Sequence, residues 1–298
     1  MSMKNTGIDL EREKQEQDGT EWEFGASSPV CIAANIPIGE RIKYLPEGEV
    51  QKGKDDFMDC ATRGPANILE TKFNYLIANK LISPEKIAFL KDKGYLNKKG
   101  KVEFSDRFNA IKSGTTKRGN SLKAPINSMH TDGLIPKAML PANKNMTWEE
   151  YHNLFDITNE MEELGKEFLT HFTINYDKVY IQEFPDSIQE EMIGVAGYAW
   201  PKPVNGEYPK TTKDENHVFV YFATPQYLIF DNYLDEGKEG DFVKKLADDY
   251  LLYMYGYRLI IGENTSVEQQ KINIMLKIIE AMKALIAILS KKVGAWLS

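Results

Sequence analysis

With 298 residues the chain is long enough for one large domain or two medium ones, and its formal net charge of −7 argues against a surface built to neutralise nucleic-acid phosphates. Its 2 cysteines are too few for a disulfide framework, its first residues lack the apolar core of a signal peptide, and no uncharged apolar stretch approaches the ~20 residues of a membrane-spanning helix. We therefore expect a cytoplasmic protein with no nucleic-acid partner and no membrane span.

The first part of the chain carries helical signals after an irregular start. Residues 1–28 are polar, acidic and without periodicity, so we expect a flexible leader there. Pro and Gly then punctuate the chain up to about residue 67, as they do in loops. Apolar residues at three- and four-residue steps, Pro at a first helical position and Gly after a helix end predict the helices that follow. The predicted helices cover residues 66–80, 83–94, 105–114, 121–133 and 147–172, the last as one long helix opened by a Thr147–Glu150 capping box.

After Ile174 the pattern changes to short runs of Val, Ile, Tyr and Phe separated by turn residues, which is typical of strands. The predicted strands cover residues 177–184, 192–200, 217–223, 226–233 and 257–262. Helices that precede strands, rather than alternate with them, indicate the α+β class.

Residues 266–298 predict an amphipathic helix of a different kind, because their apolar residues keep the heptad spacing of a coiled coil. The seam comprises Ile272, Met275, Ile279, Met282, Ile286, Leu289, Val293 and Trp296. Such a seam favours self-association or a protein partner through residues 272–297. Further isoleucines and leucines widen the apolar face, so docking on the body of the chain or on a lipid surface is equally compatible with the pattern.

Cys60 and His217 are the candidate reactive residues. A lone cysteine is usually a small buried hydrophobe, and Cys31, within an apolar run, keeps that interpretation. Cys60 differs because it immediately precedes or opens a helix, and a helix N-terminus favours a thiolate. His217 opens one predicted strand, and Asp231 and Asn232 end the next, so an imidazole would lie beside a carboxylate or an amide that could fix its orientation.

Other chemistry finds little support in the sequence. The loop GTTKRGNS has Asn120 where a phosphate-binding loop needs its lysine, and no clear strand precedes it. No cluster of His, Cys or Asp has the spacing of metal ligands. We therefore expect neither a metal nor another cofactor.

In their order along the chain, these features resemble the papain-like cysteine peptidases over most of residues 45–262. The motifs are a Gln-containing loop before a Cys at a helix start, a Gly-rich loop, a Gly-x-Tyr element before an Asn-His strand, and a closing segment similar to Asn-Ser-Trp. In this chain they are VQKGKDDFMDC, KRGNS, NGEY with NHVFV, and YLIFDNY. Gln51 stands nine positions before Cys60, where the family usually keeps six, and the family's disulfide cysteines are missing.

The resemblance implies a two-lobed papain-like domain over residues 29–262, with a helical lobe at about 60–170 and an antiparallel β-sheet or barrel lobe at about 174–262. It implies a triad of Cys60, His217 and Asp231, with Asn232 as the alternative third member. The resemblance also implies that Gln51 contributes to an oxyanion hole. The substrate-binding residues that it implies are Gly119, Asn120, Asn216 and Tyr233. The Phe-Ser-Asp run is also similar to papain-like proteins of tailed phages, which would allow a virion-associated protein.

Three functions follow from these expectations. The leading hypothesis is a cysteine peptidase that cleaves a peptide or protein substrate. The second is a papain-like fold kept as a binding or assembly module, for example in a virus particle, that oligomerises through its C-terminal helix. The third is related Cys-His chemistry, such as transamidation or the cleavage of cell-wall peptides.

Overall fold

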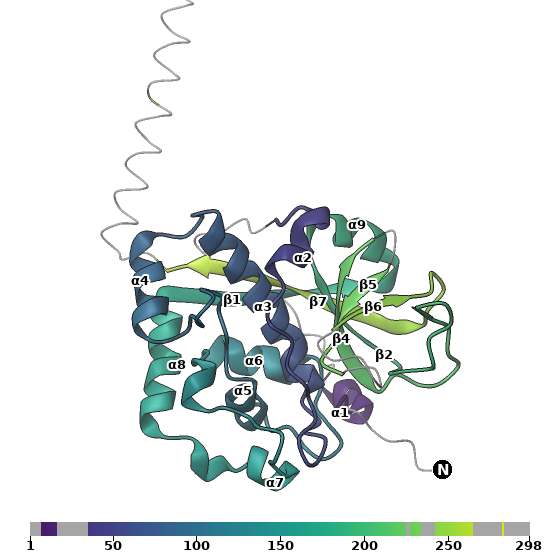
Figure 1. Cartoon of the computed structure of the whole chain (residues 1–298), viewed down its shortest axis with the longest axis horizontal. Coiled ribbons are helices and arrows are strands. Elements are labelled where there is room, and N and C mark those ends of the chain that lie inside the picture. Colours follow the sequence, from purple (N-terminus) through teal and green to yellow (C-terminus); the bar gives the residue numbers. More distant parts are fainter. Residues whose placement is uncertain (1–6, 17–34, 225–226, 234–241, 265–281, 283–298) are drawn as a thin grey trace, which may run out of the picture. The chain divides into compact units, whose positions relative to one another are not determined.

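The computed structural model describes residues 7–16, 35–224, 227–233, 242–264 and 282. The chain divides into two units, residues 1–263 and residues 264–298, and every element labelled in Figure 1 belongs to the first unit. The heptad helix predicted at 266–298 lies outside the described residues except for Met282.

Helices make up the part of the first unit that precedes residue 172. Helix α3 (Cys60–Ala78) runs through the middle of the unit, and helices α4 to α8 lie to one side of it (Figure 1). The helices in chain order are α1 (Leu10–Gln15), η1 (Ile38–Glu40), α2 (Arg41–Tyr44), α3, α4 (Pro84–Asp92), α5 (Asp106–Lys112), α6 (Lys123–Thr131), η2 (Lys137–Met139), α7 (Trp148–Tyr151), η3 (Leu154–Asp156) and α8 (Asn159–His171).

A seven-stranded sheet follows in the order β1-β7-β2-β4-β5-β6-β3, antiparallel throughout except for the pair β3 and β6. Within the described residues, the helices that interrupt it are η4 (Ile181–Glu183) and α9 (Phe184–Glu190). The strands are β1 (Phe172–Tyr180), β2 (Ile193–Gly197), β3 (Glu207–Tyr208), β4 (His217–Ala223), β5 (Leu228–Phe230), β6 (Val243–Leu246) and β7 (Leu252–Glu263). A helical part followed by a sheet confirms the predicted α+β class.

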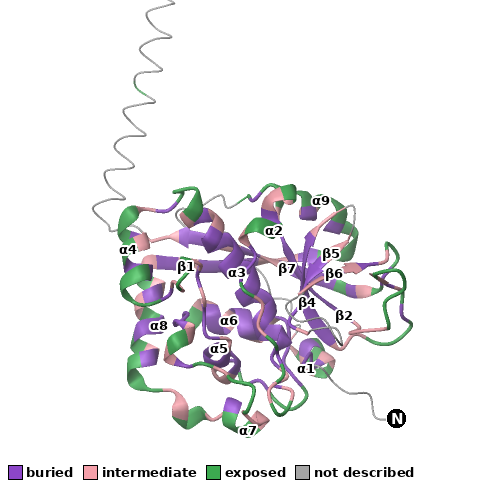
Figure 2. Ribbon diagram, in the orientation of Figure 1, coloured by how far each residue is buried: buried purple, intermediate pink, exposed green. Residues whose placement is uncertain are grey.

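Helix α3 joins the two parts because it is buried along nearly its whole length (Figure 2). Leu69, Phe73 and Leu76 pack into the main core, and Phe73 makes an edge-on contact with Phe172 at the start of β1. Gly64 allows the helix to approach the sheet, since a Cβ there would lie 2.8 Å from the Tyr257 hydroxyl. A helix buried on all sides is a rigid support for any residue at its end.

The start of α3 differs from the sequence prediction. Helical spacing was visible only from residue 66, and Pro65 favours a first-turn position, yet the helix begins at Cys60 and contains Pro65. The extra turn is held by Asp59, whose backbone oxygen accepts the N–H of Thr62 at 2.8 Å and whose carboxylate binds Arg63. Cys60 is therefore the first residue of the helix.

The single long helix predicted at 147–172 is wrong. The capping box of Thr147 and Glu150 is formed, but it opens only the four residues of α7. The chain then turns through η3, and α8 starts separately behind the N-cap Thr158, whose hydroxyl accepts the Met161 N–H. Asn153 and Thr158 both favour caps over helix interiors, and they divide the segment.

The flexible leader predicted at 1–28 needs correction for residues 7–16, the part of it that the structure describes. Ile8 pairs with Asn120 as a parallel bridge, and α1 follows behind its N-cap Asp9. Ile8, Asp9 and Glu13 are buried. We call residues 7–16 the N-terminal strap.

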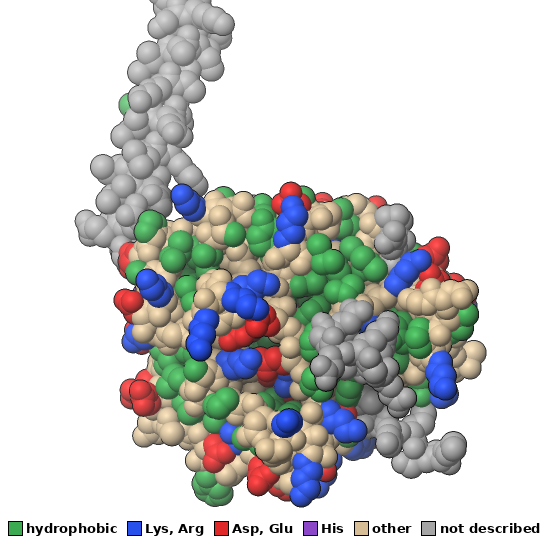
Figure 3. Space-filling view, in the orientation of Figure 1, with side chains coloured by type: hydrophobic (Ala, Val, Ile, Leu, Met, Phe, Trp, Pro, Cys, Tyr) green, Lys and Arg blue, Asp and Glu red, His purple; other side chains and the backbone are tan. Residues whose placement is uncertain are grey.

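Exposed charges of both signs are interspersed over the face of the molecule in Figure 3, and none of them gathers into a large single-sign patch there. Several are paired, as in the contacts of Lys99 with Glu47 at 2.7 Å and of Lys112 with Glu162 at 2.6 Å. The expected lack of a nucleic-acid partner stays a prediction. Within the described residues, the helices are all too short or too polar to cross a bilayer.

Candidate active site

A histidine and an aspartate meet at one end of the sheet. His217 is the first residue of β4 and Asp231 directly follows β5, and because these antiparallel strands are neighbours, the two side chains meet. His217 Nε2 lies 2.5 Å from Asp231 Oδ1, and both side chains are fully buried. The other ring nitrogen, His217 Nδ1, is buried and has no hydrogen-bond partner in the described part of the chain.

The second carboxylate oxygen of Asp231 has two partners that the sequence did not reveal. Lys244 Nζ donates to Oδ2 at 2.8 Å, and the indole N–H of Trp200 donates to the same atom at 2.9 Å. Burial alone would raise the pKa of Asp231, but His217 and Lys244 outweigh it and hold that pKa below its ordinary value. Asp231 therefore remains a carboxylate that is fixed on both sides.

Cys60 lies beside this pair. The backbone N–H of Val218, the residue after His217, donates to Cys60 Sγ at 3.3 Å. The thiol at the start of α3 therefore contacts the first residues of strand β4. The thiol has no exposed surface, and burial raises its pKa well above the ordinary value, with the nearby carboxylates of Asp59, Asp56 and Asp231 adding to the effect. In this state Cys60 is a neutral thiol at pH 7.

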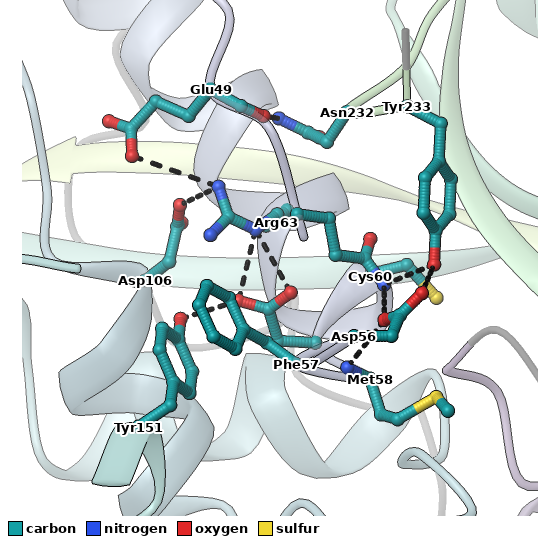
Figure 4. A network of polar contacts seen from close by, with 12 residues as sticks. Glu49, Asp56, Phe57, Met58, Cys60, Arg63, Asp106, Tyr151, Asn232 and Tyr233 are labelled. Atoms are coloured by element: carbon teal, nitrogen blue, oxygen red, sulfur yellow. Dashed lines mark hydrogen bonds and ion pairs between the residues drawn. The ribbon is translucent and has the colours of Figure 1, made fainter. Parts of the chain in front are cut away.

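Gln51, Asp56 and Tyr233 form a polar cluster next to Cys60. Gln51 Nε2 lies 3.1 Å from Tyr233 Oη and 3.2 Å from Asp56 Oδ1, and the Tyr233 hydroxyl donates to Asp56 (Figure 4). The Tyr233 ring also packs against the His217 ring, with 4.7 Å between centroids. The side-chain amide of Gln51, to which the resemblance assigned an oxyanion-hole role, thus contacts Asp56 and Tyr233.

The side chains of Asn232 and Asn216 support the loops around the site. Asn232 accepts from Asn67 of α3 at 2.8 Å and donates to the Glu49 carbonyl at 3.0 Å. Asn216 Oδ1 accepts the Ala199 N–H at 3.0 Å and so fixes the loop that carries Trp200. Of the two candidates for the third triad position, the structure places Asp231 against the imidazole.

A buried ion network anchors the start of α3. Arg63 donates to Asp59 at 2.9 Å, lies 2.9 Å from Asp106, and faces Glu49 on the same side (Figure 4). The Tyr151 hydroxyl donates to Asp59 Oδ2 at 2.5 Å. Because Asp59 directly precedes Cys60, these contacts fix the backbone that presents the thiol.

The N-terminal strap covers the thiol. The Asn120 N–H donates to the Gly7 carbonyl at 3.0 Å, and the Asp9 N–H donates back to the Asn120 carbonyl at 2.8 Å. A Cβ on Gly7 would lie 2.7 Å from Cys60 Sγ, and a Cβ on Gly119 would lie 2.1 Å from the Gly7 carbonyl carbon. Gly119 and Asn120, which the sequence assigned to substrate binding, hold a segment of the same chain.

Carboxylates on α1 fasten the strap. Glu13, 2% exposed, accepts the Leu122 N–H at 2.5 Å and also the Tyr255 hydroxyl. The Ser121 hydroxyl donates to Glu16 at 2.5 Å, and Arg12 donates to the Gly114 carbonyl at 3.0 Å. Burial raises the pKa of Glu13, although the hydrogen bonds from Tyr255 and Leu122 partly offset it.

Sequence reasoning missed Lys244, Trp200 and Gly7. Lys244 follows the alternation of the short run VKKL, where every second side chain points inward, but that run is too polar to be predicted as a buried strand. Trp200 was visible only as the end of an apolar run, and nothing local marks Gly7. Among the residues that the structure describes, no group of His, Cys, Asp and Glu could hold a metal ion.

No protein-family model matches the sequence, and no curated protein does. Solved structures with a similar fold are cysteine proteases. Xylellain from Xylella fastidiosa is 14% identical over 81% of this chain and 99% of that one, with a TM-score of 0.48. A Carica candamarcensis cysteine protease is 10% identical over 77% of this chain and 98% of that one, with a TM-score of 0.45. The ragweed protease Amb a 11, in its proform, is 10% identical over 86% of this chain and 70% of that one, with a TM-score of 0.43.

These structures are of the kind that the sequence motifs resemble, but they are distant from this chain. The chemistry of the site therefore rests on the contacts of Cys60, His217 and Asp231.

Proposed function

We propose that the protein is a cysteine peptidase and that the structure is its closed form, in which the N-terminal strap covers the nucleophile. The observation that carries the proposal is the convergence of three buried groups. Cys60 Sγ accepts the N–H of Val218, and the adjacent His217 is held by Asp231 at 2.5 Å. A thiol, an imidazole and a carboxylate in this order are the parts of a nucleophilic triad.

The proposed reaction begins when the strap leaves and a substrate enters. His217 Nδ1 takes the proton of Cys60, because Nε2 is already engaged by Asp231, and the thiolate attacks the carbonyl carbon of the scissile bond. Backbone N–H groups at the N-terminus of α3 stabilise the oxyanion that forms. The imidazolium then gives its proton to the leaving amine, and water hydrolyses the thioester to release the acid and restore the thiol.

Release of the strap has a second consequence for the thiol. Burial is the largest cause of the raised pKa of Cys60, so access of water would lower that pKa and bring a thiolate within reach at neutral pH. Burial under the strap thus both blocks access to the thiol and keeps it protonated.

The experiment compares four full-length chains on a proteome-derived peptide library. Ile8→Asp places a charge at a site that is 2% exposed and should release the strap, whereas Gln15→Asp makes the same change of charge at an exposed position of the same segment. We expect cleavage by Ile8→Asp, little by the wild type and by Gln15→Asp, and none by the double variant Ile8→Asp/Cys60→Ala. Equal cleavage with and without Cys60, or none by Ile8→Asp when its strap is shown to be released, would overturn the proposal.

The complete burial of Cys60 favours one other function, a binding or assembly module that keeps the fold without the reaction. In such a module Cys60 would stay unreactive after the strap is released. A thiol-directed epoxide separates the two functions, because rapid and selective modification of Cys60 in Ile8→Asp, located by peptide mass spectrometry, requires an activated thiol.

A further inference from the structure

Lys244 is a buried cation that the proposed reaction does not use. It lies on β6 (Val243–Leu246) and is 3% exposed, and its ammonium group donates to Asp231 Oδ2 at 2.8 Å and to the Tyr233 carbonyl. Asp231 is completely buried. Because an ammonium group carries a high desolvation cost, a lysine is rarely this deep unless it has a specific partner.

The position of Lys244 completes a row of charges. Its partner Asp231 lies between it and His217, one carboxylate oxygen for each, and Trp200 adds an N–H on the side of Lys244. The ammonium also lies 5.6 Å from the centre of the Trp200 ring. Asp231 is therefore shared between the imidazole of His217 and the ammonium group of Lys244.

The charge of Asp231 would otherwise oppose the chemistry of Cys60. The thiol already faces the carboxylates of Asp59 and Asp56 and the hydroxyls of Tyr233 and Tyr257, and every negative charge near it disfavours a thiolate. Asp231 is a third such charge, and Lys244 is the charged group that contacts it on the side away from His217. In a buried site with a low effective dielectric constant, a compensating charge at this distance has a strong effect.

We propose that Lys244 is a positioning residue that neutralises Asp231, so that His217 is oriented by a fixed oxygen acceptor that brings no net negative charge to the thiolate. The Asp231–Lys244 pair then acts electrically as an uncharged amide would, with the orientation set by two ionic contacts. This inference deepens the proposed function and rests on it.

The test follows the pH dependence of Cys60 alkylation by iodoacetamide in full-length chains, measured by peptide mass spectrometry. Lys244→Met leaves the Asp231 charge uncompensated, so the pH at which the alkylation rate is half-maximal should rise by about one unit. At a fixed pH below that midpoint, alkylation should be about tenfold slower. Asp231→Asn leaves Lys244 uncompensated and should move the midpoint down. Asp231→Asn/Lys244→Met removes both charges and should return it to the wild-type position.

Two further variants separate charge from packing. Lys244→Arg keeps the charge and should keep the wild-type midpoint. Lys245→Met removes the neighbouring cation, whose side chain is 43% exposed and pairs with Glu207 at 2.7 Å, and should leave the profile unchanged. All of these chains carry the same strap, so any pH dependence of its opening cancels in the comparison.

The inference fails if the Lys244→Met profile superimposes on that of the wild type, or if the double variant is shifted as far as Lys244→Met. If Lys244→Met does not fold, the downward shift in Asp231→Asn and the return to the wild-type midpoint in the double variant still decide the question. Alkylation does not depend on peptide cleavage. Shifted profiles together with no cleavage by Ile8→Asp, once its strap is shown to be released, would overturn the proposed function alone. Superimposed profiles together with cleavage by Ile8→Asp would overturn this inference alone.

Discussion

At the scale of single residues, the site combines groups whose environments have opposite effects on their charges. Asp231 is buried yet keeps its pKa below the ordinary value because its contacts with His217 and Lys244 outweigh the effect of burial. Cys60, in contrast, is buried near carboxylates, and both burial and those carboxylates raise its pKa. In the proposed peptidase, Asp231 is thus already ionised while the thiol is held neutral. Only the thiol must change its surroundings for the site to become active.

Glu13 makes the attachment of the strap depend on pH. Burial raises its pKa in the docked strap above the ordinary value of 4.5, so the docked form binds a proton more tightly than the released form. The contribution of Glu13 to docking is fully present below the ordinary pKa and is lost as the pH rises through the raised value. We expect hydrogen exchange of residues 7–16, corrected for its intrinsic rate, to show less protection at the higher pH.

Variants of Glu13 and Glu11 test this pH dependence. Glu13→Gln resembles the protonated side chain and should make the protection nearly independent of pH, whereas Glu11→Gln, on the exposed face of the same helix, should leave the dependence in place. A Glu13→Gln chain that keeps the full pH dependence would contradict the assignment.

The sequence predicted the chemically distinctive residues and not their partners. Cys60, His217 and Asp231 stood out because each lies where a predicted helix or strand begins or ends. Lys244 and Trp200 contact Asp231 from other loops and strands, and no local pattern specifies which distant side chains will meet. The contacts of Gln51 could not be predicted for the same reason, because its partner Tyr233 lies far away in the sequence.

At the scale of elements, the strap is a short segment that docks on a loop by backbone pairing. Its attachment requires glycine at position 119, where the backbone has φ of +95° and passes close to Gly7. Segments of this kind are too short to show a periodic pattern of apolar residues, since residues 7–16 contain about one and a half turns of helix and a single β-bridge. The strands of the sheet core, in contrast, were predicted because β-branched and aromatic residues fill them.

Gly119→Ala is expected to displace the strap. Its Cβ would lie 2.1 Å from the Gly7 carbonyl carbon, a distance that requires the strap to move, and the positive φ adds strain. We expect Cys60 to be alkylated at least about tenfold faster at a fixed pH, as for the loss of roughly 1.4 kcal/mol of docking free energy. Gly94→Ala is the matched control, because its φ of +80° carries the same kind of strain but its Cβ meets no atom within 4 Å.

Equal alkylation rates in the Gly119→Ala and Gly94→Ala chains would show that contact between Gly119 and Gly7 does not control access to the thiol.

At the scale of the whole first unit, the site depends on how closely α3 packs against the sheet. Gly64 lies one turn after Cys60, and a Cβ there would lie 2.8 Å from the Tyr257 hydroxyl on β7 and 3.1 Å from Val218 on β4. The general division into a helical part and a sheet was predictable from the order of the patterns. The distance between them was not, because it is set by contacts between residues more than a hundred positions apart.

Gly64→Ala tests this packing. The added methyl group must push α3 away from β4 and β7, and overpacking of this kind costs about 1–3 kcal/mol in the free energy of unfolding. Gly39→Ala, where a Cβ meets nothing within 4 Å, should change that free energy little. Denaturant unfolding of both variants measures the difference, and equal stabilities would contradict the close approach.

The most direct test of the central claim, that His217 activates Cys60, measures the alkylation of Cys60 against pH in Ile8→Asp and in Ile8→Asp/His217→Ala. We predict that the chain with His217 reacts at neutral pH and that the chain with alanine reacts only as the pH approaches the ordinary range of a free thiol. Identical profiles in the two chains would show that the imidazole does not act on the thiol.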